Sequence, residues 1–363
     1  MIDLRLQALF LELVRIDAPS GNEHAMMRYL MSYFSALGLD AYLDDTGKRA
    51  GIDTTNVVVK IAGGGDFFLA AHQDTVRSTA ELRPVIHEDR ITSDGTTILG
   101  ADNRAGMAAI LYAVEEAVRM RKTIRPCTLV FTVCEETSMA GSQHFEPAST
   151  LTHGFTFDSS LPPGSFVNRS CGAIAFTLEV IGRQAHAGLA PEKGVNAIRI
   201  ASEALSRFPY GRIDEETLAN IGTIEGGSAI NVVPDLVKII GEIRAEDTYK
   251  AETMMMEVLQ DFRETGKAYG GQVRNEYVWD FIPYSIDECE IPCRRLKEVT
   301  AQLGLPFKGV KSMGGSDAHW FNHKGVKTIN LGIGAQNPHQ DEEFIRLQDL
   351  QAAANIASLL ITK

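Results

Sequence analysis

The sequence predicts an α/β protein in which a mixed sheet is sandwiched by helices and a ferredoxin-like α+β domain is inserted. Short apolar segments bounded by glycines, at 56–61 and 67–71, have the pattern of strands buried on both faces. They alternate with helical patterns such as the one at 103–121, which indicates a sheet covered on both sides. A change of pattern between about 170 and 279 predicts the insertion.

The first part of the chain begins with two predicted helices. Apolar residues recur with helical spacing over 4–14. The tetrapeptide Ser20-Gly21-Asn22-Glu23 has the pattern of a capping box, and the helix that it opens should end near Gly38. Further strands are predicted at 128–134 and 155–157.

The inserted segment has its own order of elements. Strand, helix, strand, strand, helix and strand are predicted at 173–180, 195–208, 219–225, 236–244, 249–269 and 272–279. This β-α-β-β-α-β order is that of a ferredoxin-like unit. The α/β pattern then resumes, with helices at 292–303 and 347–360 and a strand at 327–332. We therefore expect a discontinuous outer domain, residues 1–169 and 281–363, around an inserted domain at 170–280.

Composition and charge exclude several kinds of partner. The chain has 363 residues, of which 44% are hydrophobic and 23% charged, as in ordinary globular proteins. Its formal net charge is −12 and it has no run of Lys or Arg, so neither nucleic acid nor a membrane is an expected partner. Asp3, Arg5 and Glu12 interrupt the first apolar segment, which argues against a signal peptide. We expect a cytoplasmic protein.

Residues of the types that bind metal ions stand at five strand ends or loop-to-helix junctions. They are His72, Asp102, Glu136, Asp158 and His339. In open α/β sheets ligands bind beyond the carboxyl ends of the strands, so several of these side chains should lie together. Zinc accepts histidine nitrogen and carboxylate oxygen, and these residues can serve two ions if one carboxylate bridges them. Such a site keeps about one positive charge, which would stabilise a hydroxide and a developing oxyanion.

Two further acidic residues fit supporting roles. Asp74 can accept a hydrogen bond from the metal-free nitrogen of His72 and so orient that ring. Glu135 would be free to act as a general base on a water and then as an acid toward the leaving amine. Each feature alone also has an ordinary explanation: a chance His-x-Asp, a solvated Glu-Glu pair, and a helix cap at Asp102.

Together, these segments resemble the superfamily of dinuclear zinc aminopeptidases, aminoacylases and carboxypeptidases, and within it the peptidase T-like branch. The resemblance covers almost the whole chain and implies a zinc-exopeptidase-like catalytic domain with an inserted lid domain that can also form a homodimer contact. The matching segments keep the order of the family: HQDTV from His72, LGADNRAGMAAI from Leu99, VCEETSMAGS from Val133, FDSS from Phe157, GRQAHAG from Gly182, GGSAINVVPD from Gly226, GEIRAED from Gly241, GGSDAHWF from Gly314 and PHQDEEF from Pro338.

The resemblance assigns the metal ligands. It implies that His72 and Asp158 bind one ion, that Glu136 and His339 bind the other, and that Asp102 bridges the two. The mixed nitrogen and oxygen ligands accept zinc, cobalt or manganese, and zinc is the ion that we expect.

Other roles also follow from the resemblance. Glu135 would be the general base and Asp74 the orienter of the first histidine, and the peptide bond between Asp102 and Asn103 is expected to be cis. His186 matches the lid histidine that stabilises the oxyanion in such enzymes.

Three more residues are expected on the substrate side. Asn231 and Arg244 match positions that hold the substrate, and a guanidinium suits capture of a peptide carboxylate. An ion pair with Glu242 or Asp247 is the ordinary alternative for the arginine. Gly315 lies in a loop whose glycines let the backbone approach a ligand.

The expected function is that of a metal-dependent exopeptidase that releases the N-terminal residue from tripeptides, by a metal-bridging hydroxide with a glutamate base. A carboxypeptidase, a deacetylase or an N-acyl amino acid amidohydrolase on the same site is an alternative, because the sequence does not reveal which end of the substrate is held. The segment GGSDAH from Gly314 departs from the GGTDG-like string of tripeptidases. A non-catalytic binding protein is a more remote alternative. Family members that have lost catalysis usually lack a metal ligand or the base, whereas this chain keeps all five ligand positions and Glu135.

Overall fold

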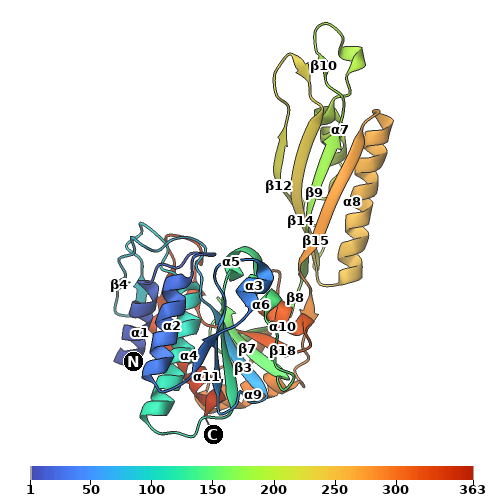
Figure 1. Cartoon of the computed structure of the whole chain (residues 1–363). Helices are drawn as coiled ribbons and strands as arrows, with labels where there is room; N and C mark the ends of the chain where they lie inside the picture. Colours follow the sequence, from blue (N-terminus) through green and yellow to red (C-terminus); the bar gives the residue numbers. More distant parts are fainter. Residues whose placement is uncertain (1, 363) are drawn as a thin grey trace. The chain divides into compact units, whose positions relative to one another are not determined.

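Figure 1 shows the computed structural model of the protein, which describes residues 2–362. The chain divides into two compact units. The larger comprises Met1–Arg169, Ser285–Lys311 and Ser316–Lys363, and the smaller comprises Ser170–Tyr284 and Ser312–Gly315. Residues 281–284 and 312–315, which we had assigned to the outer domain, thus lie in the smaller unit. Strand pairing that reaches Phe281 and a hydrogen bond from the Cys171 N–H to the Ser312 carbonyl (3.1 Å) tie them there.

A nine-stranded mixed sheet forms the centre of the larger unit. Eight strands follow the order β1-β2-β6-β3-β7-β18-β8-β16, and β17 pairs with β8. The central strands β6, β3, β7 and β18 are parallel neighbours, whereas β2 and β8 pair antiparallel with them. The strands are Ala41–Leu43 (β1), Val57–Ile61 (β2), Phe67–His72 (β3), Cys127–Thr132 (β6), His153–Ser159 (β7), Ser165–Ser170 (β8), Tyr284–Ser285 (β16), Lys308–Ser312 (β17) and Lys327–Gly332 (β18).

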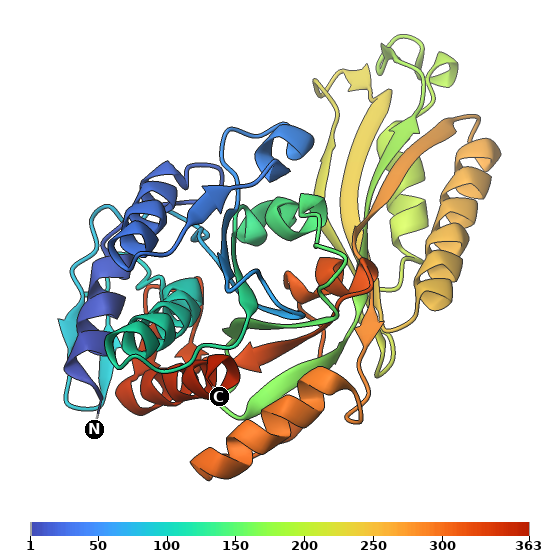
Figure 2. The same cartoon turned by 60° about the horizontal axis from the view of Figure 1, so that its bottom comes forward.

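Helices cover this sheet, as predicted. Figure 2 shows α1, α4 and α11 side by side, and α4 packs on β3 and β7. In α1 the buried residues recur at the spacing of one helical face, which explains why this segment is helical and how it packs: Leu6, Leu9, Phe10, Leu13 and Val14. The helices are Leu4–Val14 (α1), His24–Ala36 (α2), Thr46–Ala50 (α3), Ala101–Arg119 (α4), Glu135–Ser138 (α5), Ala140–His144 (α6), Ile291–Leu303 (α9), Ala318–His323 (α10) and Leu347–Ile361 (α11). Among residues 2–362 no helix is long and apolar enough to cross a membrane.

The start of α2 differs from the prediction. The helix forms, but the capping box does not: the Ser20 hydroxyl donates to Oδ2 of Asp74 (2.6 Å). Glu23 is fully buried and accepts the N–H groups of Gly21 (3.0 Å) and Cys134 (2.9 Å). Both side chains serve distant parts of the chain, which a pattern local to the helix cannot reveal.

A small four-stranded sheet in the larger unit was not predicted, because its strands are only two or three residues long. Its order is β19-β20-β5-β4. The strands β19 and β20 pair antiparallel, so the chain between them, which contains His339, is the loop of a hairpin. The strands are Val85–Ile86 (β4), Arg90–Thr92 (β5), Ala335–Gln336 (β19) and Phe344–Arg346 (β20).

The smaller unit has the predicted ferredoxin-like arrangement. Its five-stranded antiparallel sheet follows the order β11-β12-β14-β9-β15, and two helices supply the rest of a core that contains Phe176, Ile200, Met255 and Phe262. A separate short pair joins β10 to β13. The elements are Gly172–Ile181 (β9), Ala185–His186 (β10), Ala197–Leu205 (α7), Gly211–Arg212 (β11), Thr217–Gly226 (β12), Val232–Val233 (β13), Leu236–Ala245 (β14), Thr248–Ala268 (α8) and Gln272–Phe281 (β15).

Candidate metal centre

Neighbouring strand ends bring the predicted metal-binding side chains together. His72 is the last residue of β3, Asp158 lies near the end of β7, and Glu136 follows β6 in the short helix α5. Because these strands are parallel neighbours, their carboxyl ends share one edge of the sheet. Asp102 joins them from the start of α4, and His339 from the hairpin between β19 and β20.

Five side chains form two groups that share one aspartate. In the first group, Nε2 of His72 lies 3.0 Å from Oδ1 of Asp102 and 3.1 Å from Oδ1 of Asp158. In the second group, Nε2 of His339 lies 2.8 Å from Oε2 of Glu136 and 3.6 Å from Oδ2 of Asp102. The two oxygens of Asp102 therefore face different histidines, which is the geometry that a bridging carboxylate requires.

The electrostatics of the site fit bound cations. Burial, together with the charge of Asp158, raises the pKa of Glu135 well above its usual range, and burial raises the pKa of Asp158 as well. Oε1 of Glu136 is buried and has no hydrogen-bond partner within residues 2–362. Such a crowd of buried carboxylates is costly without counter-charges. Imidazole nitrogens with carboxylate oxygens are a donor set that zinc accepts, so the residues present fit two divalent ions.

The histidines respond to the same carboxylates. Burial opposes a charge on His72, but Asp158 and Asp102 outweigh it and raise the pKa of His72 well above its usual range. The hydrogen bonds of His339 with Asp102 and Glu136 raise the pKa of His339 to about 10. Histidine must be neutral to bind a metal, so metal binding would release protons here.

Asp74 is connected to more of the site than the sequence suggested. Its Oδ1 lies 3.3 Å from Nδ1 of His72, and its backbone carbonyl oxygen lies 3.1 Å from the same nitrogen. It also accepts the backbone N–H groups of Glu135 (Oδ1, 3.1 Å) and Glu136 (Oδ2, 3.1 Å) and the Ser20 hydroxyl. One fully buried carboxylate thus holds the first turn of α5, where two predicted site residues stand.

Several buried side chains beside the site were not singled out from the sequence. Asn103 donates to Oδ1 of Asp158 (3.0 Å), and the expected cis peptide bond between Asp102 and Asn103 is present. The fully buried guanidinium of Arg104 donates to the carbonyls of Gln73 and Ile16. Asn103 and Arg104 stand inside the quoted ADNRAG segment, which was the available signal. The local sequence does not predict that the side chains of Asn103 and Arg104 point inward.

The smaller unit carries His186 and Asn231 close together. The Asn231 carbonyl accepts the N–H of Ala187 (2.9 Å), where β10 meets β13. Nδ1 of His186 accepts the N–H groups of Gly188 and Leu189, both at 3.2 Å. Since Nδ1 is an acceptor, the proton of the neutral ring resides on Nε2, which leaves an exposed N–H donor.

The other two substrate-side candidates lie elsewhere in the smaller unit. Arg244 makes the ion pair that was its ordinary alternative: its Nη2 is 2.9 Å from Oε2 of Glu242. Nη1 of Arg244 also donates to the Met313 carbonyl (2.7 Å), which brings this side chain to the 312–315 segment. Gly315 is exposed in that segment.

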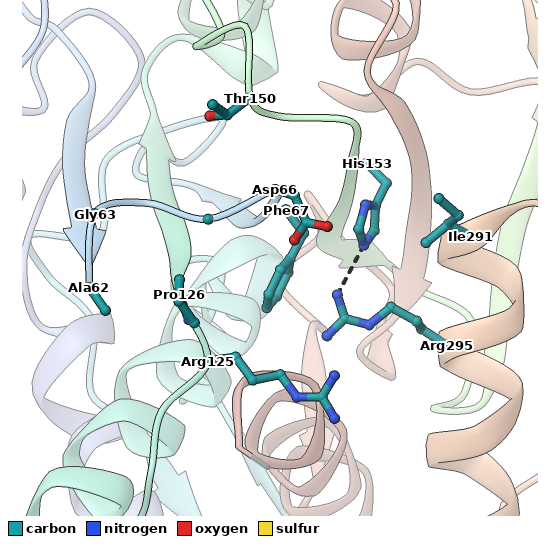
Figure 3. Close-up of a pocket in the computed structure, with 11 residues that line it drawn as sticks. Ala62, Gly63, Asp66, Phe67, Arg125, Pro126, Thr150, His153, Ile291 and Arg295 are labelled. Carbon is teal, nitrogen blue, oxygen red and sulfur yellow. Dashed lines mark hydrogen bonds between the residues drawn. The ribbon is translucent and has the colours of Figure 1, made fainter.

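A cavity of about 940 Å³ lies at the opposite ends of the same strands, away from the metal centre (Figure 3). Phe67 and His153, the first residues of β3 and β7, line it, and their rings stack with centroids 5.7 Å apart. Nε2 of His153 lies 2.9 Å from Nη1 of Arg295, and Nδ1 of His153 lies 2.9 Å from the Thr152 hydroxyl. Burial, with the guanidinium beside it, lowers the pKa of His153 to about 4, so the ring is neutral at pH 7.

The fold and the metal centre define the class of the protein. A mixed α/β sheet whose strand ends gather two histidine and carboxylate groups around a shared aspartate suits a hydrolase that uses two divalent ions. Residues 168–270 match the family described as the peptidase dimerisation domain, and residues 56–168 match peptidase family M28.

Known proteins resemble the chain over nearly its full length. It is 33% identical to the uncharacterized protein YqjE of Bacillus subtilis, over 98% of this chain and 97% of that one. A tripeptidase from Staphylococcus aureus has a solved structure with a TM-score of 0.93 and 32% identity, which covers 99% of this chain and 98% of that one. Peptidase T of Brevibacillus brevis is 26% identical, over 88% of this chain and 79% of that one.

These comparisons decide the family. The chain belongs to the peptidase T-like branch of the dinuclear metallopeptidase superfamily. It is therefore a hydrolytic enzyme, and the non-catalytic alternative considered from the sequence is wrong.

Proposed function

We propose that the protein is a metal-dependent aminopeptidase that releases the N-terminal residue from short peptides, tripeptides in particular. One observation carries the proposal: the two oxygens of Asp102 face two histidines. Oε2 of Glu135 lies 4.0 Å from Nε2 of the first of them, His72. The relatives named tripeptidase and peptidase T support peptides as the substrate.

The proposed metal ligands follow the two groups of side chains. His72 and Asp158 would hold one zinc ion, Glu136 and His339 the other, and Asp102 both. When bound, two such ions would lower the pKa of a water and polarise the scissile carbonyl.

Glu135 is the proposed general base. Its carboxylate would take a proton from the attacking water and deliver it to the leaving amine. The hydrogen bond from its N–H to Oδ1 of Asp74 fixes the backbone from which that carboxylate projects. Burial and the nearby Asp158 raise its pKa, which suits a group that must both accept and release a proton.

The smaller unit would supply the contacts to the substrate. The exposed Nε2–H of His186 is a donor that can stabilise an oxyanion, and Asn231 lies beside it. Arg244 would bind a peptide carboxylate by exchanging its partner Glu242, with Gly315 nearby in the chain segment that Arg244 contacts.

We also propose a homodimer formed through the smaller unit. The match to a peptidase dimerisation domain at 168–270 supports it. Exposed apolar side chains in this unit, at Ile224, Ile230 and Leu236, are groups that an interface would cover. Sedimentation should find a species of twice the 39.7 kDa chain mass, and a monomer at all concentrations would contradict the proposal.

Glu135→Gln tests the proposed base directly. Turnover of a tripeptide should fall by about 10² to 10⁴-fold, because glutamine cannot accept the proton. Metal content should stay unchanged, because Glu135 belongs to neither ligand group. Glu146→Gln, an exposed glutamate of the same unit, is the matched control and should keep full activity. A fully active Glu135→Gln enzyme would sink the assignment.

A further inference from the structure

We propose that Glu343 is a positioning residue that holds Asp102 and His339 in register and thereby sets the affinity of the ion bound by Asp102, Glu136 and His339. The inference rests on the metal-dependent function proposed above. Glu343 belongs to neither group of proposed metal ligands, and its carboxylate contacts the backbone that carries one of them.

Glu343 contacts the start of α4 from a distant part of the chain. Its side chain is fully buried, and its two oxygens accept two backbone N–H groups, Oε2 from Gly100 (2.7 Å) and Oε1 from Asp102 (2.9 Å). Asp102 and Asn103 have non-helical backbone angles and interrupt the first turn of α4, so the N–H groups there lack the partners of a regular helix. A carboxylate 241 residues further along the chain accepts these N–H groups and fixes the backbone of Asp102 itself.

The loop that carries His339 has an unfavourable backbone conformation. His339 and Asn337 have positive φ angles of 68° and 52°, a region that costs a non-glycine residue about 1 kcal/mol or more and persists only where the surroundings impose it. Half of the His339 side chain is exposed, so few neighbours hold it. Glu343 stands at the base of this hairpin, directly before β20, and its N–H donates to the Gln340 carbonyl (3.1 Å). It is therefore the point at which the hairpin is fastened to Asp102.

The two metal groups depend on this fastening to different extents. His72 and Asp158 lie on strands of the central sheet, which neighbouring strands hold in place without Glu343. Glu343 joins Asp102 and His339, which are two of the three ligands of the second group, whereas only Asp102 belongs to the first group as well. Loss of a group that orients metal ligands typically costs about 10 to 100-fold in affinity. We expect that loss mainly for the ion of the second group.

The test is a zinc titration of the metal-free protein against a competing chelator. Glu343→Gln keeps the shape but offers one oxygen for two N–H groups, and Glu342→Gln is a matched control because Glu342 is the adjacent, exposed glutamate. For Glu343→Gln we expect one ion to bind at least about tenfold more weakly, and the other within about threefold of the unaltered protein. For Glu342→Gln both affinities should be unchanged.

Two further variants keep the inference falsifiable. Should Glu343→Gln fail to fold, as judged by circular dichroism, Glu343→Asp is titrated instead, and the same difference between the two ions is expected. In a His339→Ala background, in which the second group has lost its histidine, Glu343→Gln can act on the ion of the first group only through Asp102, so that affinity should change by less than about threefold. Equal weakening of both ions, or none, would overturn the inference while leaving the proposed function intact. An unaltered protein that binds fewer than two ions would instead overturn the proposed metal centre and the inference with it.

Discussion

His153 should make the stability of the larger unit depend on pH below neutrality. Its pKa is about 4 in the folded chain and 6.5 without the fold, so folding favours the neutral ring. The contribution of His153 to the free energy of unfolding is therefore present above pH 6.5 and is lost as the pH drops from 6.5 toward 4. Between pH 7 and pH 5 these two values correspond to a loss of about 2 kcal/mol. Solvent at the mouth of the cavity screens part of the interaction between His153 and the guanidinium, so we expect a loss of about 1 to 2 kcal/mol in the free energy of unfolding.

The assay isolates His153 from the carboxylates that titrate over the same range. Urea unfolding of the metal-free protein is measured at pH 7 and pH 5 for the unaltered chain and for His153→Gln. Glutamine keeps an acceptor for Arg295 but does not titrate, so the variant should lose less stability between the two pH values, by about 1 to 2 kcal/mol. His24→Gln, at an exposed histidine, should behave like the unaltered chain.

An identical pH dependence in the unaltered chain and in His153→Gln would refute this reasoning. It would mean that His153 has the same pKa in the folded and the unfolded chain, and hence that the contact between His153 and Arg295 shown in Figure 3 does not keep the ring neutral at pH 5.

Three other perturbations have expected outcomes. Gly106→Ala places a Cβ 2.0 Å from the Phe157 carbonyl oxygen and 2.3 Å from Oδ1 of Asn103, so thermal unfolding should show a loss of about 3 kcal/mol; an unchanged melting temperature would contradict this packing. Lys324→Met removes the amine that caps three carbonyls at the end of α6, and denaturant unfolding should show a loss of about 2 kcal/mol, with no change as the contrary result. Metal removal by a chelator should abolish peptidase activity and lower the melting temperature, and zinc should restore both, because bound ions stabilise the folded state.

Much of the fold could be predicted because it follows local patterns. The helical spacing at 4–14 and the apolar segment at 327–332 coincide with α1 and β18. The capping box was wrong because Ser20 and Glu23 bind residues that are distant in sequence. The small sheet with β19 and β20 escaped prediction because strands of two or three residues leave no periodic pattern.

In the candidate site, too, the residue types could be predicted from the sequence, whereas contacts between residues distant in sequence could not. The types of the residues and the resemblance pointed to His72, Asp102 and Glu136, and the structure brings these side chains together at one edge of the sheet. The carboxylates that hold their backbones were harder to find. In the sequence, Glu343 is one of several acidic residues in a loop. The N–H groups that it accepts belong to residues 241 and 243 positions away, so no local pattern distinguishes it.

The identity of the first product tests the central claim most directly. The zinc-loaded protein is given a free tripeptide, its N-acetylated form and a dipeptide, and the released amino acids are followed over time. Release of the N-terminal residue from the free tripeptide alone is the predicted result. Cleavage of the blocked peptide, or first release of the C-terminal residue, would contradict the aminopeptidase assignment and favour a carboxypeptidase, deacetylase or acyl-amino-acid hydrolase on the same metal centre.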